Sequence, residues 1–348
     1  MSAPSPWVVV LCGGIGSRFW PLSTPERPKQ FLPLVGDAPM LADTMRRVRA
    51  IAPVERTLVL TSAALAPGVR ALIPELTDAN VLIEPRAAGT AAALLYAARV
   101  IAERVGPATP MLSVHADWAI GDDAAFAATL QQAATEAHAH RALVTVGIVP
   151  THPDPGLGYL APGAVIDGEL RRVERFVEKP AVALATELIA LGGLWNSGIF
   201  AWCAGDLLDE ARVHAPELHG ALEAPLADPV ALFARVATPI AIDVAIMERS
   251  ARVMMLPGRF GWNDVGTWSA LSRVKATDAD GNVAHGATHL RDAHGNVVFA
   301  EGSDVVLWGV SDLVVVVRNG VTLVTTRERA TDLKPLLGTL PPELRDRR

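Results

Sequence analysis

The residues best suited to chemistry lie in a glycine-rich segment near the start of the chain. The apolar run WVVV leads into the segment LCGGIGSRFWPLSTPERPKQFLPLVG. At Gly13, Gly14 and Gly16 the missing side chains let backbone N–H groups approach a phosphate or a base. Arg18 and Lys29 follow, and two cations over such a loop can neutralise a triphosphate and the pyrophosphate that it releases. The segment therefore predicts a phosphate-binding site.

The common glycine-rich motifs do not describe this segment. No Gly-Lys-Ser/Thr follows the glycines, which excludes a Walker A loop. Phe19 stands where the third glycine of the dinucleotide fingerprint would be. Glycines after a strand equally suit a simple tight turn. The specific signal is the combination of the glycines with Arg18 and Lys29.

The elements that must position this loop alternate between strand and helix over about the first 150 residues. Apolar, β-branched runs predict strands over 7–14, 56–62, 79–85, 110–117 and 142–150. Alanine-rich stretches predict helices over 41–52, 91–105 and 124–142. This alternation predicts an α/β fold with a doubly wound, mostly parallel sheet covered by helices on both faces.

The character of the sequence changes at about residue 276. Short β-branched runs are there separated by Asp-Gly, His-Gly and Asn-Gly turn signals. DGN and HGN recur near positions 280 and 295, which suggests coil-like repeats. We therefore expect an α/β domain over 1–275 and a small β-rich, β-helix-like domain over 276–348 that ends in a helix at 328–338.

Bulk properties exclude several classes of function. The formal net charge is −6, and no stretch concentrates Lys and Arg into the basic face that a nucleic acid requires. No apolar stretch approaches the length of a membrane span, and the N-terminus lacks the basic region of a secretory signal. Cys12 and Cys203 lie in apolar runs and are expected to be small buried side chains. We expect a cytoplasmic protein that binds neither a nucleic acid nor a membrane.

The order of motifs near the N-terminus resembles that of a known family. The chain contains Gly-Gly-x-Gly-x-Arg, then Pro-Leu, then Pro-Lys-Gln-Phe-Leu. This order is similar to the signature of the sugar-phosphate nucleotidyltransferases. Within that family, Pro-Lys-Gln-Phe is typical of the mannose-1-phosphate guanylyltransferase branch. The resemblance implies a Rossmann-like fold and the synthesis of GDP-mannose and pyrophosphate from GTP and mannose 1-phosphate. It assigns the nucleotide to Leu11, Gly13, Gly14 and Gly16, and the reacting phosphates to Arg18 and Lys29.

Nucleotidyl transfer needs charge neutralisation and alignment more than a strong base. A Mg²⁺ ion held by hard carboxylate oxygens is therefore expected. Two aspartates resemble the metal-binding carboxylates of the family. They are Asp117, which comes after the run PMLSV, and Asp264, which lies in FGWNDVGTW. An isolated aspartate in either place would otherwise suit a helix cap or a turn. The family pattern Pro-Ala-Asp-His is altered here, because the chain has His115 and Trp118 on either side of Ala-Asp.

Three further motifs resemble the family's sugar-phosphate site. They are FVEKP at 176–180, GLGYL at 156–160 and WNSGIF at 195–200. Lys179 would bind the phosphate of the sugar, and Glu178 would accept hydrogen bonds from sugar hydroxyls. An Asn side chain offers both a donor and an acceptor to hydroxyls. The resemblance thus assigns the sugar phosphate to Gly158, Tyr159, Glu178, Lys179, Asn196 and Gly198.

The segment expected to select the base departs most from the family pattern. IEPRAAGTAAAL keeps Glu84 and Thr90, which the resemblance assigns to the nucleotide, but has Ala88 and Gly89 where an Arg-Asn pair is usual. Glu84 could accept hydrogen bonds from a guanine edge. Another substrate pair therefore stays possible, with UTP as the nucleotide or glucose 1-phosphate as the sugar phosphate. A catalytically silent sensor of nucleotide sugars is a further alternative. The β-rich C-terminal domain could serve to form a homodimer.

Overall fold

The computed structural model describes residues 4–347, and the chain divides into two compact units that we describe separately. The first unit comprises the chain up to Gly13, Met45–His115 and Asp122–Trp262. The second comprises Gly14–Thr44, Ala116–Gly121 and the chain from Asn263 onward. The chain therefore passes between the units at several points, and helix α1 (Met40–Val48) contains residues of both.

A nine-stranded sheet forms the centre of the first unit. Its order is β3-β2-β1-β4-β8-β5-β9-β7-β6. The strands β1, β2, β3 and β4 run parallel to one another, as do β5 and β9, whereas β8 is antiparallel to its neighbours β4 and β5. The strands are β1 Trp7–Cys12, β2 Thr57–Ser62, β3 Val81–Glu84, β4 Pro110–His115, β5 Leu143–Ile148, β6 Tyr159–Asp167, β7 Leu170–Val177, β8 Leu194–Cys203 and β9 Val253–Gly258.

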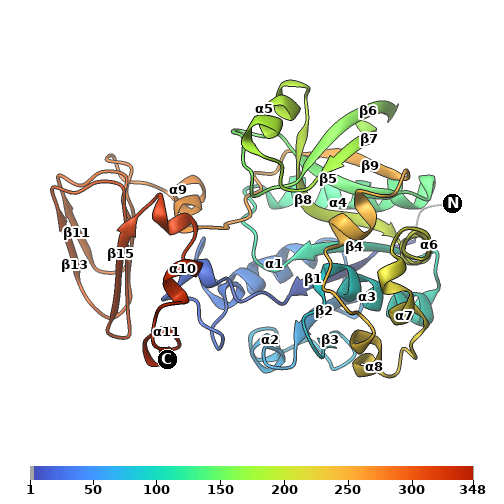
Figure 1. The fold of residues 1–348 in the computed structure, drawn as a ribbon, viewed down its shortest axis with the longest axis horizontal. Coiled ribbons are helices and arrows are strands. Elements are labelled where there is room, and N and C mark those ends of the chain that lie inside the picture. Colours follow the sequence, from blue (N-terminus) through green and yellow to red (C-terminus); the bar gives the residue numbers. More distant parts are fainter. Residues whose placement is uncertain (1–3, 348) are drawn as a thin grey trace. The chain divides into compact units, whose positions relative to one another are not determined.

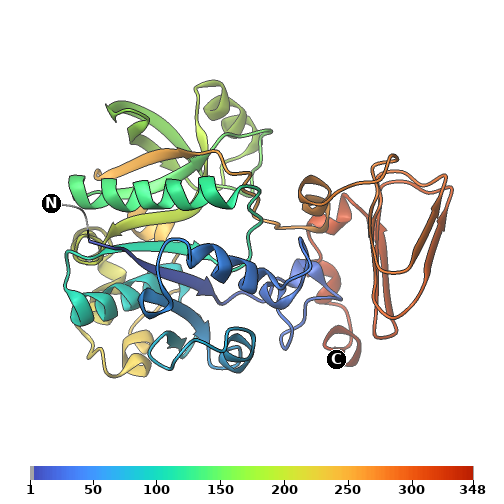
Figure 2. The same cartoon turned by 180° about the vertical axis from the view of Figure 1, so that it is seen from behind.

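Helices cover both faces of this sheet (Figures 1 and 2). α3 and α6 pack together on one face, while α4 lies on the other face, against β4, β5 and β8. The helices of this unit, besides α1, are α2 Ala66–Leu72, α3 Gly89–Val105, α4 Asp123–His140, α5 Val182–Ala190, α6 Ala204–His214, α7 His219–Glu223 and α8 Pro229–Ala234. The alanine-rich stretches thus form the closely packed helices: most alanines of α3 are buried. The predicted class, a mostly parallel α/β sheet with a strand-rich C-terminal part, is confirmed.

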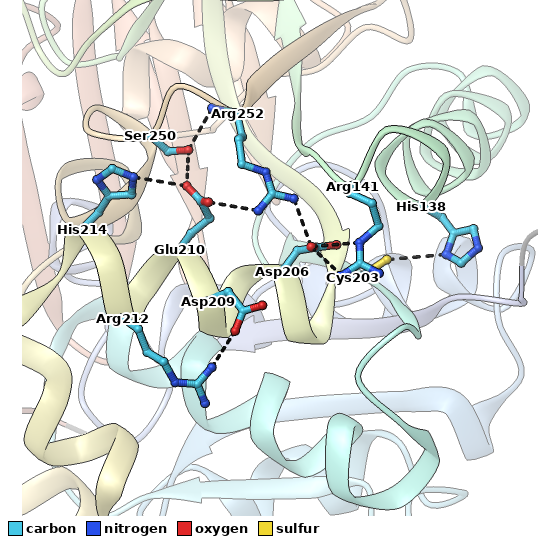
Figure 3. A network of polar contacts seen from close by, with 10 residues as sticks. All are labelled: His138, Arg141, Cys203, Asp206, Asp209, Glu210, Arg212, His214, Ser250 and Arg252. Atoms are coloured by element: carbon cyan, nitrogen blue, oxygen red, sulfur yellow. Dashed lines mark hydrogen bonds and ion pairs between the residues drawn. The ribbon is translucent and has the colours of Figure 1, made fainter.

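An ion-pair network fixes α6 beside the starts of β5 and β9 (Figure 3). Asp206 on α6 is almost fully buried and lies 2.9 Å from Arg141 and 3.0 Å from Arg252. Arg252 also lies 3.0 Å from Glu210, and His214 contacts the same carboxylate at 3.4 Å. Buried carboxylates need such partners because an unpaired charge in a protein interior is costly.

The C-terminal part of the second unit is a coil of short strands. β10, β12 and β14 pair in parallel, β11 pairs in parallel with β13, and β15 closes the first of these sheets in the antiparallel direction. Its elements are β10 Val283–His285, β11 Thr288–Arg291, β12 Val297–Ala300, β13 Val305–Trp308, β14 Leu313–Arg318, β15 Val321–Thr326, α9 Leu271–Val274, α10 Lys334–Leu337 and α11 Pro342–Arg345. The closing helix predicted at 328–338 is a 3₁₀ turn over Arg329–Thr331 followed by α10.

The recurring DGN and HGN sequences mark successive turns of this coil. Asn282 and Asn296 are both buried, and the side-chain oxygen of Asn282 accepts a hydrogen bond from the backbone N–H of Asn296 at 2.8 Å. The side-chain oxygen of Asn296 in turn accepts the N–H of Leu313 at 2.9 Å. The repeat in the sequence is therefore a ladder of asparagines that satisfies backbone groups inside the coil.

Residues 14–44 pack against this coil. Phe19, Trp268 and Phe299 share one core, with ring centroids 5.0 Å apart for Phe19 and Trp268 and 5.2 Å apart for Trp268 and Phe299. Arg318 donates to the carbonyl of Leu22 at 2.8 Å. The glycine-rich loop thus belongs to the same compact unit as the C-terminal strands, and the domain boundary at 275 and 276 stays a prediction.

Candidate active site

The loop after β1 has a conformation that only glycine allows at one position. Gly16 has φ = +72°, and a Cβ atom there would lie 2.3 Å from Cβ of Lys29. The backbone N–H of Lys29 donates to the carbonyl of Ile15 at 3.0 Å. Because a side chain at Gly16 would collide with Lys29, this glycine lets the loop close on the lysine.

Lys29 connects the two predicted metal ligands. Its Nζ donates to Oδ2 of Asp117 at 3.0 Å and to the carbonyl of Asp264 at 2.9 Å. The side chain of Lys29 is 5% exposed and that of Asp117 33% exposed. The aliphatic stem is therefore buried while the ammonium group is held at a site that solvent reaches from the side of Asp117.

The backbone beside Asp264 is strained. Val265 has φ = +47°, a left-handed conformation that is rare for a β-branched residue. The side-chain oxygen of Asn263 accepts the N–H of Val265 at 2.8 Å and helps to hold this turn. At Gly266 a Cβ atom would lie 2.4 Å from Oδ2 of Asp264, so glycine lets that carboxylate keep its present position. Of these three neighbours of Asp264, Asn263 and Gly266 have residue types that by themselves indicate only a turn.

Arg18 completes this group within the second unit. It lies on the 3₁₀ turn Ser17–Phe19, and its Nη1 donates to the carbonyl of Gly266 at 3.2 Å. The four predicted catalytic residues, which are far apart in the sequence, thus lie together around the turn at 263–266. They are Arg18, Lys29, Asp117 and Asp264. Their catalytic roles stay predictions.

The residues predicted to bind the nucleotide in the first unit lie at the carboxyl ends of strands. Leu11 is near the end of β1, Gly13 follows it directly, and Glu84 is the last residue of β3. A Cβ atom at Gly13 would lie 3.7 Å from Oε1 of Glu84. Burial raises the pKa of Glu84 to about 7. A carboxyl group with a pKa raised by desolvation is more often found at a functional site than on an ordinary surface.

Thr90 is tied to a distant segment of the same unit. Its Oγ1 accepts the backbone N–H of Ile242 at 2.9 Å. Gly89 has φ = +86°, and a Cβ atom there would lie 2.1 Å from the carbonyl oxygen of Ile240. The start of α3 is thereby fixed against residues 240–242. A direct contact of Thr90 with a nucleotide stays a prediction.

The residues predicted to bind the sugar phosphate meet where β7 ends and where β6 and β8 begin. A Cβ atom at Gly158 would lie 2.6 Å from Oε2 of Glu178 and 3.4 Å from Cβ of Asn196. The backbone N–H of Asn196 donates to the carbonyl of Gly158 at 2.8 Å. Lys179 pairs with Glu178 and has φ = +48°, an uncommon conformation for a residue with a side chain. The structure therefore brings four of the six predicted residues together in one place.

The amide of Asn196 is fixed by protein groups. Its Nδ2 donates to Oδ1 of Asp243 at 2.8 Å. Its Oδ1 accepts from Oγ1 of Thr145 at 3.0 Å and from the N–H of Gly198 at 3.3 Å. Gly198 has φ = +76°, which accounts for glycine at this position. Asp243 was not recognised in the sequence, because a lone aspartate in an irregular segment carries no motif of its own.

Tyr159 is fully buried and holds the preceding loop. Its hydroxyl accepts the N–H of Asp154 at 2.8 Å and the Nε1–H of Trp195 at 3.0 Å, and it donates to the carbonyl of Asp154 at 3.2 Å. The structure thus gives Tyr159 a supporting position beneath Gly158. Its predicted contact with the sugar stays a prediction.

Three other expectations bear on the class of protein. Over residues 4–347 no three His, Cys, Asp or Glu side chains are grouped so that they alone could hold a metal ion. Among the helices of the same residues, none combines the length and the apolar character that crossing a membrane requires. Cys12 and Cys203 are both buried, as predicted.

An α/β sheet whose first strand leads into a glycine-rich segment is typical of enzymes that transfer a nucleotide. The chain belongs to the Nucleotidyl transferase family, whose profile matches residues 7–281. It is 38% identical to a mannose-1-phosphate guanylyltransferase of Escherichia coli (strain K12) over 94% of this chain and 72% of that protein.

Two more similarities extend over nearly the whole chain. The alginate biosynthesis protein AlgA of Pseudomonas aeruginosa is 35% identical over 95% of this chain and 71% of its own length. A crystal structure described as mannose-1-phosphate geranyltransferase from Thermus thermophilus superimposes with a TM-score of 0.88, at 34% identity, and covers 96% of this chain and 99% of that chain.

Proposed function

We propose that the protein transfers GMP from GTP to mannose 1-phosphate and thereby makes GDP-mannose and pyrophosphate. The observation that carries the proposal is the position of Lys29, which bonds to the carboxylate of Asp117 and to the backbone of Asp264 at 3.0 and 2.9 Å. Similarity to proteins named mannose-1-phosphate guanylyltransferase supports the choice of substrates.

In the proposed reaction a phosphate oxygen of mannose 1-phosphate attacks the α-phosphorus of GTP in line. A new bond forms between this oxygen and the α-phosphorus, the bond from the α-phosphorus to the bridging oxygen of the β-phosphate breaks, and pyrophosphate leaves with the electron pair. Arg18 and Lys29 stabilise the charge that develops on the phosphate oxygens. Lys29 also holds Asp117 and the turn at Asp264 beside the phosphates.

The carboxylates of Asp117 and Asp264 fit a Mg²⁺ ion, which prefers hard oxygen ligands. The space that Gly266 leaves beside Asp264 supports this role. Since two carboxylates do not complete an octahedral shell, phosphate oxygens and water would supply the remaining ligands. When bound, the ion would neutralise the phosphates and polarise the α-phosphorus.

The proposal gives the other residues the following roles. Leu11, Gly13, Gly14 and Gly16 provide backbone N–H groups for the nucleotide, and Glu84 accepts hydrogen bonds from the guanine edge. Lys179 binds the phosphate of the sugar, and Glu178 accepts hydrogen bonds from its hydroxyls. Asn196 and Gly198 shape the same pocket.

A matrix of substrates tests the proposal. Purified protein is assayed for pyrophosphate release with each of four nucleoside triphosphates and with mannose 1-phosphate, glucose 1-phosphate and other sugar phosphates. Turnover is expected with GTP and mannose 1-phosphate. Turnover with a different pair alone would assign another donor or acceptor, and no turnover with any pair would assign a silent sensor; either result overturns the proposal.

The metal role is tested separately by titrating Mg²⁺ into Asp264→Asn and Asp117→Asn. Each substitution removes a negatively charged ligand, so the rate should fall by roughly 10²-fold or the half-saturating Mg²⁺ concentration should rise by about tenfold or more. Asp209→Asn, at an exposed position on α6, is the control. An unchanged Mg²⁺ dependence in both active-site variants would remove the metal role.

A homodimer and a cytoplasmic location complete the proposal. Val306 and Trp308 on β13 are 67% and 74% exposed, and they line an apolar groove of the coil together with residues of β14 and β15. A second copy seated on this groove would cover them. Sedimentation of the protein and of Trp308→Ser tests the dimer, and cell fractionation tests the location.

A further inference from the structure

We propose that Asp243 is a substrate-recognition residue, whose carboxylate accepts a hydrogen bond from a hydroxyl of the hexose phosphate beside Glu178. The inference rests on the proposed function, because it identifies a further residue of the same sugar site. No motif of the sequence analysis contains Asp243.

The first argument is the position of Asp243. Its Oδ1 accepts the Nδ2–H of Asn196 at 2.8 Å, so it borders the group in which Gly158, Glu178 and Asn196 meet. The other polar atom of that amide is already used, since Oδ1 of Asn196 accepts from Thr145 at 3.0 Å. Asn196 therefore has little left to offer a sugar, and its amide instead fixes the carboxylate of Asp243.

The second argument is the shape of the segment that carries Asp243. Residues Asp243–Met247 form a π-helical turn, a conformation that is rare and frequent at functional sites. This turn and the residue that follows it contact two of the segments that carry the predicted sugar site. Asp243 accepts from Asn196 after the start of β8, and Oε1 of Glu248 accepts the backbone N–H of Glu178 at 3.0 Å.

The third argument is that Asp243 has no cation of its own. Among residues 4–347, no Lys, Arg or His forms an ion pair with Asp243, and Lys179 is paired with Glu178 instead. Burial, and then the negative charge of Glu178, raise the pKa of Asp243 to about 6. Because a buried carboxylate that forms no ion pair is costly, Asp243 is suited to accept hydrogen bonds. Hexose hydroxyls are the donors that the proposed substrate brings.

The experiment compares the unchanged enzyme with Asp243→Asn, which keeps an oxygen for the bond from Asn196 but removes the charge. Steady-state kinetics are measured with GTP and mannose 1-phosphate, and then with the 2-, 3-, 4- and 6-deoxy forms of mannose 1-phosphate. Asp209→Asn, on an exposed part of α6, is the matched control. Thermal unfolding at pH 8 checks that each variant is folded.

We expect Asp243→Asn to raise KM for mannose 1-phosphate by about tenfold or more and to leave KM for GTP within about twofold, as the loss of a charged hydrogen bond predicts. The unchanged enzyme should discriminate against one deoxy analogue by about tenfold or more in kcat/KM, and the variant should lose most of this discrimination. A role that is only structural would lower turnover of all analogues alike and would leave the discrimination in place.

The outcomes separate the two proposals. If the unchanged enzyme does not use GTP and mannose 1-phosphate, the proposed function fails. If it does, and Asp243→Asn has the same KM or the same discrimination among the deoxy analogues, the role of Asp243 is overturned. Should Asp243→Asn be unfolded at pH 8, Asp243→Ser takes its place with the same expected loss of discrimination.

Discussion

The Nζ atom of Lys29 lies 3.0 Å from Oδ2 of Asp117, although 88 positions separate the two residues in the sequence. The contact joins the glycine-rich segment to a residue two positions after the end of β4. The second hydrogen bond of Lys29, to the carbonyl of Asp264, connects it to the strained turn at Val265. One buried lysine thus contacts both segments that carry the predicted metal ligands. Its ammonium charge also stabilises the neighbouring carboxylate of Asp117 in the ionised form.

Lys29→Ala should lower kcat by roughly 10²–10³-fold, since it removes a charged donor from the reacting phosphates and releases both aspartates. Pyrophosphate release with saturating GTP and mannose 1-phosphate measures the effect. Lys334→Ala, at an exposed position of α10, is the control and should retain full activity. A rate for Lys29→Ala within about threefold of the unchanged enzyme, in a folded protein, would contradict this role.

Glu84→Gln should make the protein more stable at pH 8 than the unchanged form. Burial raises the pKa of Glu84 from 4.5 to about 7, so its contribution to stability is fully present below about pH 4.5 and is lost as the pH rises through about 7. The variant, which cannot ionise, keeps its stability. Relative to the unchanged protein, its free energy of unfolding should therefore rise by roughly 1–3 kcal/mol between pH 5 and pH 8.

Urea unfolding of both proteins at several pH values measures this difference. Glu169→Gln is the control of opposite sign, because Arg259 lowers the pKa of Glu169 and its contribution is lost as the pH falls. A stability difference between Glu84→Gln and the unchanged protein that does not vary with pH would show that the carboxyl group of Glu84 titrates alike in the folded and unfolded chain.

The regular part of the fold could be predicted from local patterns. The five predicted strands correspond to β1 to β5, and the three predicted helices to α1, α3 and α4, with boundaries that differ by a few residues. These patterns suffice because strands buried on both faces and alanine-rich helices have distinct sequences. The order of the strands, with β8 inserted between β4 and β5, depends on long-range pairing that no local pattern contains.

The site could be predicted only where a motif marks it. Lys29 and Asp264 were found through such motifs, but their contact arises because residues 14–44 pack with the C-terminal coil. Asn263 and Asp243 carry no signal in a single sequence, since an Asn or Asp in an irregular segment most often serves as a turn residue. Their roles become visible only through partners such as Val265 and Asn196.

Lys179→Gly should separate stability from activity. Lys179 has φ = +48° and a side chain that is 62% exposed, so glycine relieves backbone strain and loses little packing. The free energy of unfolding should change by no more than about 1 kcal/mol, because the relief is partly offset by the greater freedom of glycine in the unfolded chain. KM for mannose 1-phosphate should rise by about tenfold or more, since a charged hydrogen bond to phosphate is lost.

Asn319→Gly is the control for the backbone effect. Asn319 has φ = +49° in the turn between β14 and β15, so the substitution relieves a similar conformation in the C-terminal coil. Its kinetics should be those of the unchanged enzyme. If Lys179→Gly also kept its KM for mannose 1-phosphate, the assignment of Lys179 to the sugar phosphate would be wrong.

Arg252→Ala should be far more destabilising than Arg259→Ala, although each removes one arginine from an ion pair. Arg252 forms ion pairs with two buried carboxylates, those of Asp206 and Glu210 (Figure 3). Arg259 instead pairs with the exposed Glu169. Removing Arg252 leaves Glu210 without its arginine and Asp206 with Arg141 alone. Because a buried charge that loses its partner is costly, we expect a loss of about 2–4 kcal/mol for Arg252→Ala and less than about 1 kcal/mol for Arg259→Ala. Urea unfolding of the two variants under identical conditions measures the difference, and equal losses would mean that the network in Figure 3 is no stronger than a surface ion pair.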